Sequence, residues 1–237
     1  MSYVSAWGLS GRRAQRGWGD RYPASVATTW AISIGQMRAE SPLADDLLQV
    51  CAFLHPDAIP AALAEHILLS CGSFGPGHSA AWQLEKAVRV LMRFSLLGRR
   101  QCAGPSGQPV DALSMRRLVQ LVVRSRLDDA AGRRWAQVVV QGVASHADTF
   151  DASQRWAGLK ALAPQLQVCA GHVSAHHLDS DAALRLLRVY SDHLEYGSFQ
   201  DAAEPISAAL ALASSKHGAP RAATPRRMRL CERVHLH

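Results

Sequence analysis

Apolar residues recur at helical spacing along most of this chain, and this period constrains its fold more than any other feature. Trp30, Ile34 and Met37 begin the pattern, which returns in successive segments as far as residue 213. Side chains three and four positions apart share one face of an α-helix, so each segment predicts a helix with one buried face. Aromatic residues make up only 6% of the chain, which also favours helices over sheets.

Turn and capping residues divide residues 26–94 into four predicted helices. The breaks fall at Ser41-Pro42, His55-Pro56-Asp57, Pro60 and the glycine-rich loop 72–77. The fourth helix covers residues 82–94, and its apolar residues are Leu84, Ala87, Val88, Leu91 and Met92.

Helical spacing fails after this fourth helix. Residues 95–100 and 110–113 read as two short strands around the strong turn Gly104-Pro105-Ser106-Gly107, and a helix over 115–127 follows. A short hairpin placed after several helices is typical of the wing of a winged-helix domain. The 237 residues allow one or two domains, and the first is expected to be this one.

Helical periodicity then resumes. Asp128 caps a long helix that reaches about residue 146, and a further helix over 153–168 is expected to be interrupted by Pro164. A pair of helices over 181–196 and 199–213 is joined by Gly197-Ser198. The predicted class is therefore mainly α, with a small β-wing.

The net charge of +7 is concentrated at the two ends of the chain. Residues 1–25 carry four Arg and one Asp, and residues 214–237 carry six basic residues and one Glu. The segment 26–213 holds 16 basic and 17 acidic residues, so we do not expect nucleic acid as the partner of the folded body. The predicted organisation is a disordered basic arm (1–25), a winged-helix-like domain (26–127), a helical linker (128–180), a repeat-like helix pair (181–215) and a disordered basic tail (216–237).

Several classes of site are excluded by motif. The three Lys residues follow Glu85, Leu159 and Ser215, so none completes the Gly-Lys-Ser/Thr of a phosphate-binding P-loop. Five Cys residues without a C-x-x-C motif argue against a disulfide framework or a zinc ribbon. We find no catalytic motif, no cofactor motif, no membrane span and no signal peptide, so we expect a non-enzymatic, cytoplasmic protein without a cofactor.

One group of residues in the sequence has the chemistry of metal ligands. Cys169, His172 and His176 are spaced to share one face of an unbroken helix, where they could bind zinc. Pro164 and Gly171 argue against such a helix, and no fourth ligand is fixed. We therefore predict no metal site.

The last helix pair resembles one tetratricopeptide repeat, in which small residues let the two helices approach closely. The residues expected to pack the repeat are Leu186, Val189, Tyr190, Gly197, Ala202 and Ala209. Solenoids normally need about three repeats to bury their faces. After Gly218 the composition changes abruptly to Pro, Arg and Ala, which favours a truncated or frameshifted gene product, with a functional basic tail as the rival interpretation.

Further motifs lie upstream of this pair. They run from Tyr22 to Trp30, Ala44 to Leu54, Asp57 to Pro60, Arg93 to Leu97 and Leu113 to Gln120. In this order they resemble the region downstream of the nucleotide-binding domain in bacterial NB-ARC–tetratricopeptide proteins, which belong to the STAND class of signalling NTPases. The resemblance covers roughly residues 20–213.

The resemblance implies a winged helix that packs on a nucleotide-binding domain, followed by a linker and repeats that bind a peptide or protein. Family members carry a Met/Val-His-x motif after the wing, whose His contacts the diphosphate of bound ADP. Met115-Arg116-Arg117 stands at this place, so Arg116 replaces the His. An Arg can pair with phosphate but cannot become neutral, and an ordinary solvated helix residue is the rival interpretation.

Two function hypotheses follow. The first is a non-enzymatic regulatory and protein-interaction fragment of a STAND-type signalling protein, which would bind an NB-ARC-type domain in cis or in trans. The alternative is a winged-helix DNA-binding transcriptional regulator, with the basic residues Arg116, Arg117, Arg124 and Arg126 on the helix after Leu113.

Overall fold

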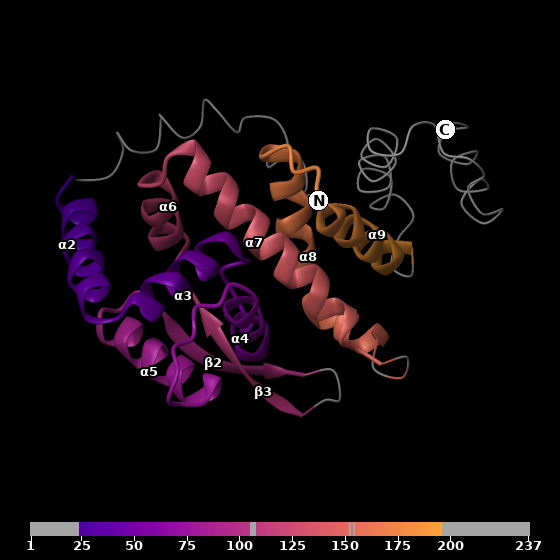
Figure 1. Cartoon of the computed structure of the whole chain (residues 1–237), viewed down its shortest axis with the longest axis horizontal. Helices are drawn as coiled ribbons and strands as arrows, with labels where there is room; N and C mark the ends of the chain where they lie inside the picture. The colour runs from indigo at the N-terminus through magenta and orange to yellow at the C-terminus, as the bar shows by residue number, and fades with distance from the viewer. Residues whose placement is uncertain (1–23, 105–107, 152, 154, 196–237) are drawn as a thin grey trace, which may run out of the picture.

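Helices make up most of the protein in a computed structural model that describes residues 24–104, 108–151, 153 and 155–195 (Figure 1). The helices are α2 (Ala24–Glu40), α3 (Pro42–Phe53), α4 (Ala61–Ser70), α5 (Ala80–Arg93), α6 (Arg117–Ser125), α7 (Asp129–Asp148), α8 (Arg155–Ala175) and α9 (Asp181–Glu195). The strands are β1 (Ile59–Pro60), β2 (Gly98–Ala103) and β3 (Pro109–Ser114). The prediction of a mainly helical protein with a small β element is confirmed.

Two helix starts form as the sequence predicts. Ser41 precedes Pro42, and its hydroxyl oxygen accepts a hydrogen bond from the amide of Ala44 at 3.2 Å. The carboxylate of Asp128 accepts one from the amide of Ala131 at 2.7 Å. Each cap satisfies one of the amide groups that the first turn of a helix leaves unpaired.

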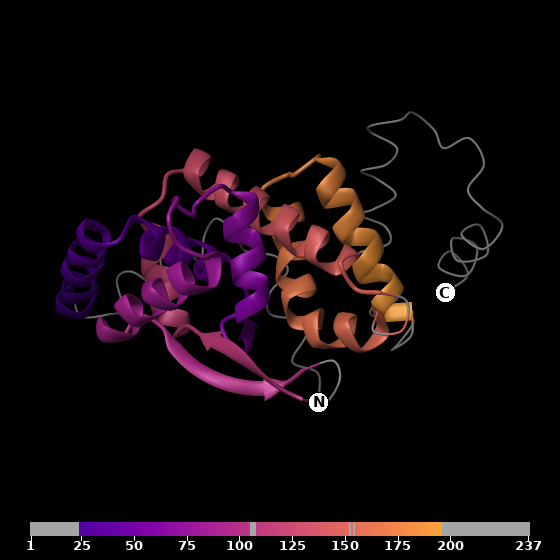
Figure 2. The ribbon, with the colours of Figure 1, turned by 60° about the horizontal axis from the view of Figure 1, so that its bottom comes forward.

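The three strands form an antiparallel sheet in the order β1-β3-β2. Ile59 pairs with Leu113, and Arg100 pairs with Ala112. The β2–β3 hairpin runs along one edge of the helical body (Figure 2). The two strands of the hairpin are predicted by the sequence, whereas β1 is not, because it is two residues long and one of them is a proline.

The helix containing Pro164 is continuous, and the predicted interruption at this residue is wrong. α8 runs from Arg155 to Ala175 and passes both Pro164 and Gly171. A proline inside a helix removes one hydrogen bond, and that carbonyl can reach water here because Pro164 is exposed. Burial of the opposite face of α8 offsets the cost; its apolar members are Leu159, Leu162, Leu166, Cys169 and Val173.

Buried apolar side chains form one continuous cluster from Ile34 on α2 to Val189 on α9. α7 crosses the molecule and contacts α3 and α4 on one side and α8 and α9 on the other (Figure 1). The boundary predicted between residues 127 and 128 thus falls at the start of a helix that packs against both parts. The division into domains stays a prediction, and most of the arm 1–25 and all of the tail 216–237 lie outside the described residues.

No helix in the described ranges is long and apolar enough to cross a membrane.

α4 and α7 are in close contact at Gly142. A methyl group at this position would lie 3.2 Å from Ile67 Cβ and 3.3 Å from Ile67 Cα, and closer still to the Ile67 Cγ1 atom. Because the obstruction includes backbone, a rotamer change of Ile67 cannot relieve all of it. Gly142 therefore sets the distance between the two helices.

We predict that Gly142→Ala destabilises the protein. The added methyl group overpacks the α4–α7 contact at a cost of roughly 1–3 kcal/mol, whereas the gain in helix propensity is at most about 1 kcal/mol. Gly171→Ala is the matched control, because nothing lies within 4 Å of its added methyl group, and it should raise the free energy of unfolding. Urea denaturation followed by circular dichroism measures both, and equal stabilities of the two variants would contradict the contact.

Candidate functional site

A groove of about 460 Å³ opens where the hairpin leaves α5 and returns toward α6. We call it the hairpin groove; its lining consists of Asp57, Met92, Ser95, Leu96, Leu97, Gly98, Arg100, Ser114, Met115 and Arg116. Two of the three predicted sensor residues, Met115 and Arg116, thus line one cavity. Arg117, the third, is exposed on the first turn of α6 and is not part of this lining.

The strand alternation of β2 separates two neighbouring arginines. Arg99 forms ion pairs with Glu85 on α5 at 2.9 Å and with Asp111 on β3 at 3.1 Å. Successive residues of a strand point to opposite faces, so Arg100 turns away from these carboxylates. It lines the hairpin groove instead, and within the described ranges no carboxylate forms an ion pair with it.

Arg116 is held at the entrance to α6 by the residue before it. The amide of Met115 donates a hydrogen bond to the carbonyl of Pro56 at 2.8 Å, and the Met115 side chain is only 3% exposed. Arg116 is the N-cap of α6 with an extended backbone, and its side chain caps nothing. The guanidinium is exposed and has no ion-pair partner among the described residues, so it can reach a group outside them.

The hairpin groove combines positive charge with apolar surface. Arg100 and Arg116 face a single carboxylate, that of Asp57. Met92 is 42% exposed, and its side chain lines the groove. The two guanidinium groups can bind an anionic group. The exposed apolar atoms beside them can contact the larger surface that carries this group.

The loop that carries Asp57 is fixed by the C-terminal end of α3. The last carbonyls of a helix have no partner within it, and those of α3 are buried. The side-chain amide of Gln120, on α6, donates to the carbonyls of Cys51 and Leu54 at 2.9 and 2.8 Å. One turn later, Arg124 donates to the carbonyl of Ala52, which places a cation at the negative end of the helix dipole.

α8 completes this cluster from the opposite side. His172 Nε2 donates to the carbonyl of Phe53 at 2.8 Å, because a carbonyl can only accept. Gln165 Oε1 accepts from the amide of His55 at 2.7 Å, where the chain leaves α3. α6 and α8 thus hold the start of the loop 55–58 that borders the hairpin groove.

Burial keeps His172 neutral. It lowers the pKa of His172 to about 4, and the neighbouring charge of Arg124 lowers it further, while the hydrogen bond to Phe53 raises it. Burial also lowers the pKa of His146 to about 4, where His66 adds repulsion. Cys169, one turn before His172, is buried and its thiol pKa is raised by that burial. Among the described residues no group of His, Cys, Asp or Glu side chains is arranged to hold a metal ion.

Only one helix of the predicted repeat lies in the described ranges. Leu186 and Val189 are buried on α9 against α7 and α8, and Tyr190 is half-buried beside them. The other predicted packing residues lie outside the described residues; they are Gly197, Ala202 and Ala209. The repeat therefore stays a prediction.

The comparisons with known proteins give one match. Residues 36–131 match a family described as a domain of unknown function, DUF7779. No curated protein matches the chain, and no solved structure matches it. The matched segment runs from the second half of α2 to the first turn of α7, so it contains the whole hairpin groove.

Sequence reasoning did not identify Arg100, Asp57 or Gln120 as functional or positioning residues. The roles of Arg100 and Asp57 depend on strand register and on a loop, which leave no periodic signal. Gln120 does leave a signal in the sequence, because it is a polar residue among the apolar residues on the buried side of a short helix. Such a residue needs a hydrogen-bond partner, and here the partner is the end of α3.

We predict that the protein loses stability as the pH falls from 6.5 toward 4. In this window the unfolded chain binds protons at the positions of His172 and His146, whereas the folded protein does not, so protonation favours unfolding. For His172 the expected loss is roughly 3 kcal/mol. His172→Gln keeps a donor near Phe53 but cannot titrate, so its stability should depend less on pH. A variant with the full wild-type slope in urea denaturation across this window would contradict the prediction.

Proposed function

We propose that this chain is a non-enzymatic regulatory part of a STAND-type NB-ARC–tetratricopeptide signalling protein. It contains no P-loop, so its action is to bind. The hairpin groove packs against an NB-ARC-type nucleotide-binding domain, in cis or in trans. The predicted repeat, which begins with α9, binds a peptide or protein.

The order of the elements supports the winged-helix part of this proposal. α3, β1, α4 and α5 precede the two antiparallel strands β2 and β3, as several helices precede the hairpin in the predicted winged-helix domain. The small sheet is antiparallel and lies at one edge of the helices (Figure 2).

The observation that carries the proposal is the position of Arg116. It follows the hairpin directly, begins α6, and lines the hairpin groove together with Arg100. A guanidinium offers two parallel donors to a phosphate, and its charge does not depend on pH. At this position it serves as a permanent phosphate contact, which favours the ADP-bound resting state of the partner domain.

The alternative, a winged-helix DNA-binding regulator, finds less support in the positions of its basic residues. Arg124 is turned inward and donates to the carbonyl of Ala52, so it is not available to a DNA backbone. On α5, the helix before the hairpin, Arg89 pairs with Glu85 and Arg93 pairs with Glu40. The positive charge that duplex DNA needs is thus partly neutralised on this surface.

We predict that R100E/R116E weakens binding to an ADP-loaded NB-ARC domain at least about tenfold, because each substitution replaces a charge-assisted hydrogen bond with repulsion. The partner is the purified NB-ARC domain of a STAND protein whose downstream region also matches the family found over residues 36–131. Isothermal titration calorimetry with the full chain measures the affinity. K160E, on the exposed side of α8, is the matched charge-reversal control.

Equal affinities of wild type and R100E/R116E would contradict the proposal. A sequence-selective, salt-dependent shift of duplex DNA by the full chain, together with no binding of the NB-ARC domain, would favour the alternative.

A further inference from the structure

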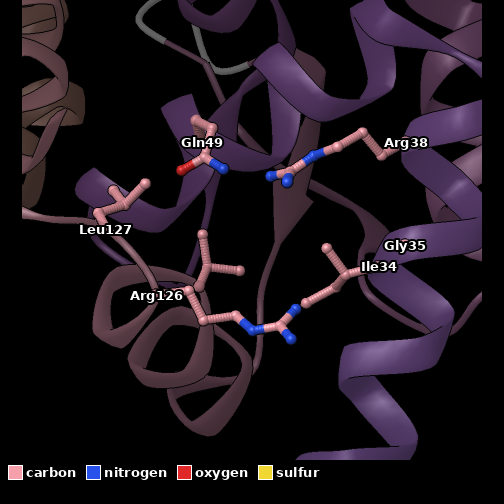
Figure 3. A pocket seen from close by; sticks show the side chains of 7 residues that line it. Ile34, Gly35, Arg38, Gln49, Arg126 and Leu127 are labelled. Atoms are coloured by element: carbon pink, nitrogen blue, oxygen red, sulfur yellow. The ribbon is translucent and has the colours of Figure 1, made fainter.

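A second cavity lies among α2, α3 and α6, away from the hairpin groove. Its volume is about 490 Å³, within the range of roughly 300–1,000 Å³ of small-molecule sites. We call it the three-helix pocket; it is lined by Ile34, Gly35, Arg38, Gln49, Val123, Arg126 and Leu127 (Figure 3).

Gln49 gives the three-helix pocket an unmet hydrogen-bonding requirement. Its side chain comes from the buried face of α3 and is only 4% exposed. Its Oε1 atom accepts no hydrogen bond from any described residue. A buried acceptor without a partner costs stability, so a residue of this kind at a cavity wall points to a donor supplied from outside the fold.

Two cations face the same space as this amide. Figure 3 shows the guanidinium groups of Arg38 and Arg126 extending into the pocket from opposite walls. Arg38 binds the carboxylate of Asp45 through Nε and Nη2 at 2.8 and 3.0 Å, which leaves Nη1 free for another acceptor. Arg126 has no ion-pair partner in the described ranges. The pocket therefore holds one uncompensated positive charge.

The rest of the lining is apolar. Ile34, Val123 and Leu127 supply aliphatic side chains, and Gly35 leaves room because it has none. A bare inorganic anion would leave this surface uncovered and the Gln49 oxygen unpaired. A ligand that satisfies every part of the lining has a carboxylate, an adjacent N–H donor and a small aliphatic group.

We infer that the three-helix pocket binds a small N-acylated amino acid or a closely similar amide-bearing organic acid. Its carboxylate lies between Arg126 and Arg38, its amide N–H donates to Gln49 Oε1, and its aliphatic side chain packs on Ile34 and Val123. A free amino acid fits less well, because its ammonium group would face two guanidinium groups. The inference does not rest on the function proposed above, because it uses none of the residues that line the hairpin groove.

The probe is N-acetyl-L-leucine, titrated into the full-length chain and followed by NMR chemical shifts. We expect saturable binding with a dissociation constant near 1 mM, as for a ligand of about a dozen atoms. N-acetyl-L-leucinamide lacks the negative charge and inorganic phosphate lacks the apolar group, so each should bind at least about tenfold more weakly.

Two substitutions test the assignment of the polar groups. R126Q removes the free cation, and Q49M removes the acceptor at nearly constant side-chain length; each should weaken N-acetyl-L-leucine binding about tenfold. Because Q49M also removes a buried unpaired acceptor, it should unfold at the same temperature as the wild type or higher, which separates lost binding from lost folding. K160Q changes an exposed residue of α8 and is the control; it should bind N-acetyl-L-leucine as the wild type does.

Four outcomes would overturn the inference. They are the absence of saturable binding, wild-type affinity in R126Q or in Q49M, an affinity for the amide or for phosphate equal to that for N-acetyl-L-leucine, and a tenfold tighter complex with N-acetyl-Gly-Gly-Leu. The last result would assign the pocket to the C-terminus of a protein partner.

Discussion

The fold depends on how the C-terminal end of α3 is satisfied inside the protein. Most of α3 is buried, and a helix that ends in the interior leaves carbonyl groups that water cannot reach. Gln120, Arg124 and His172 supply the donors, and they come from segments more than 60 residues further along the chain. α6 and α8 must therefore dock in one orientation, and the loop 55–58 that borders the hairpin groove takes its position from them.

The sequence predicts most of the helices because their apolar period is local. The caps at Ser41 and Asp128 also act within a few residues, so they can be recognised without a structure. Pro164 shows the limit of local reasoning. It disfavours a helix by its own chemistry, yet burial of the opposite face of α8 outweighs that preference.

The candidate site, too, is only partly predictable from the sequence. A sequence motif places Met115 and Arg116 side by side, and both line the hairpin groove. Arg100 joins them only through the pairing of β2 with β3, which no sequence pattern specifies. Arg124 looks like a surface cation in the sequence, but the unpaired carbonyl of Ala52 draws it inward. Tertiary hydrogen bonding thus decides which basic residues remain free to bind a partner.

The three-stranded sheet has a consequence for how other proteins can approach it. One outer strand, β1, is two residues long and ends in Pro60, which has no amide hydrogen to offer an incoming strand. The other outer strand, β2, carries Arg99 and Arg100 in mid-strand. Short, proline-terminated or charged edges resist strand addition and the aggregation that follows from it. A partner must therefore recognise side chains on this surface, because the edges of the sheet do not favour pairing with an added strand.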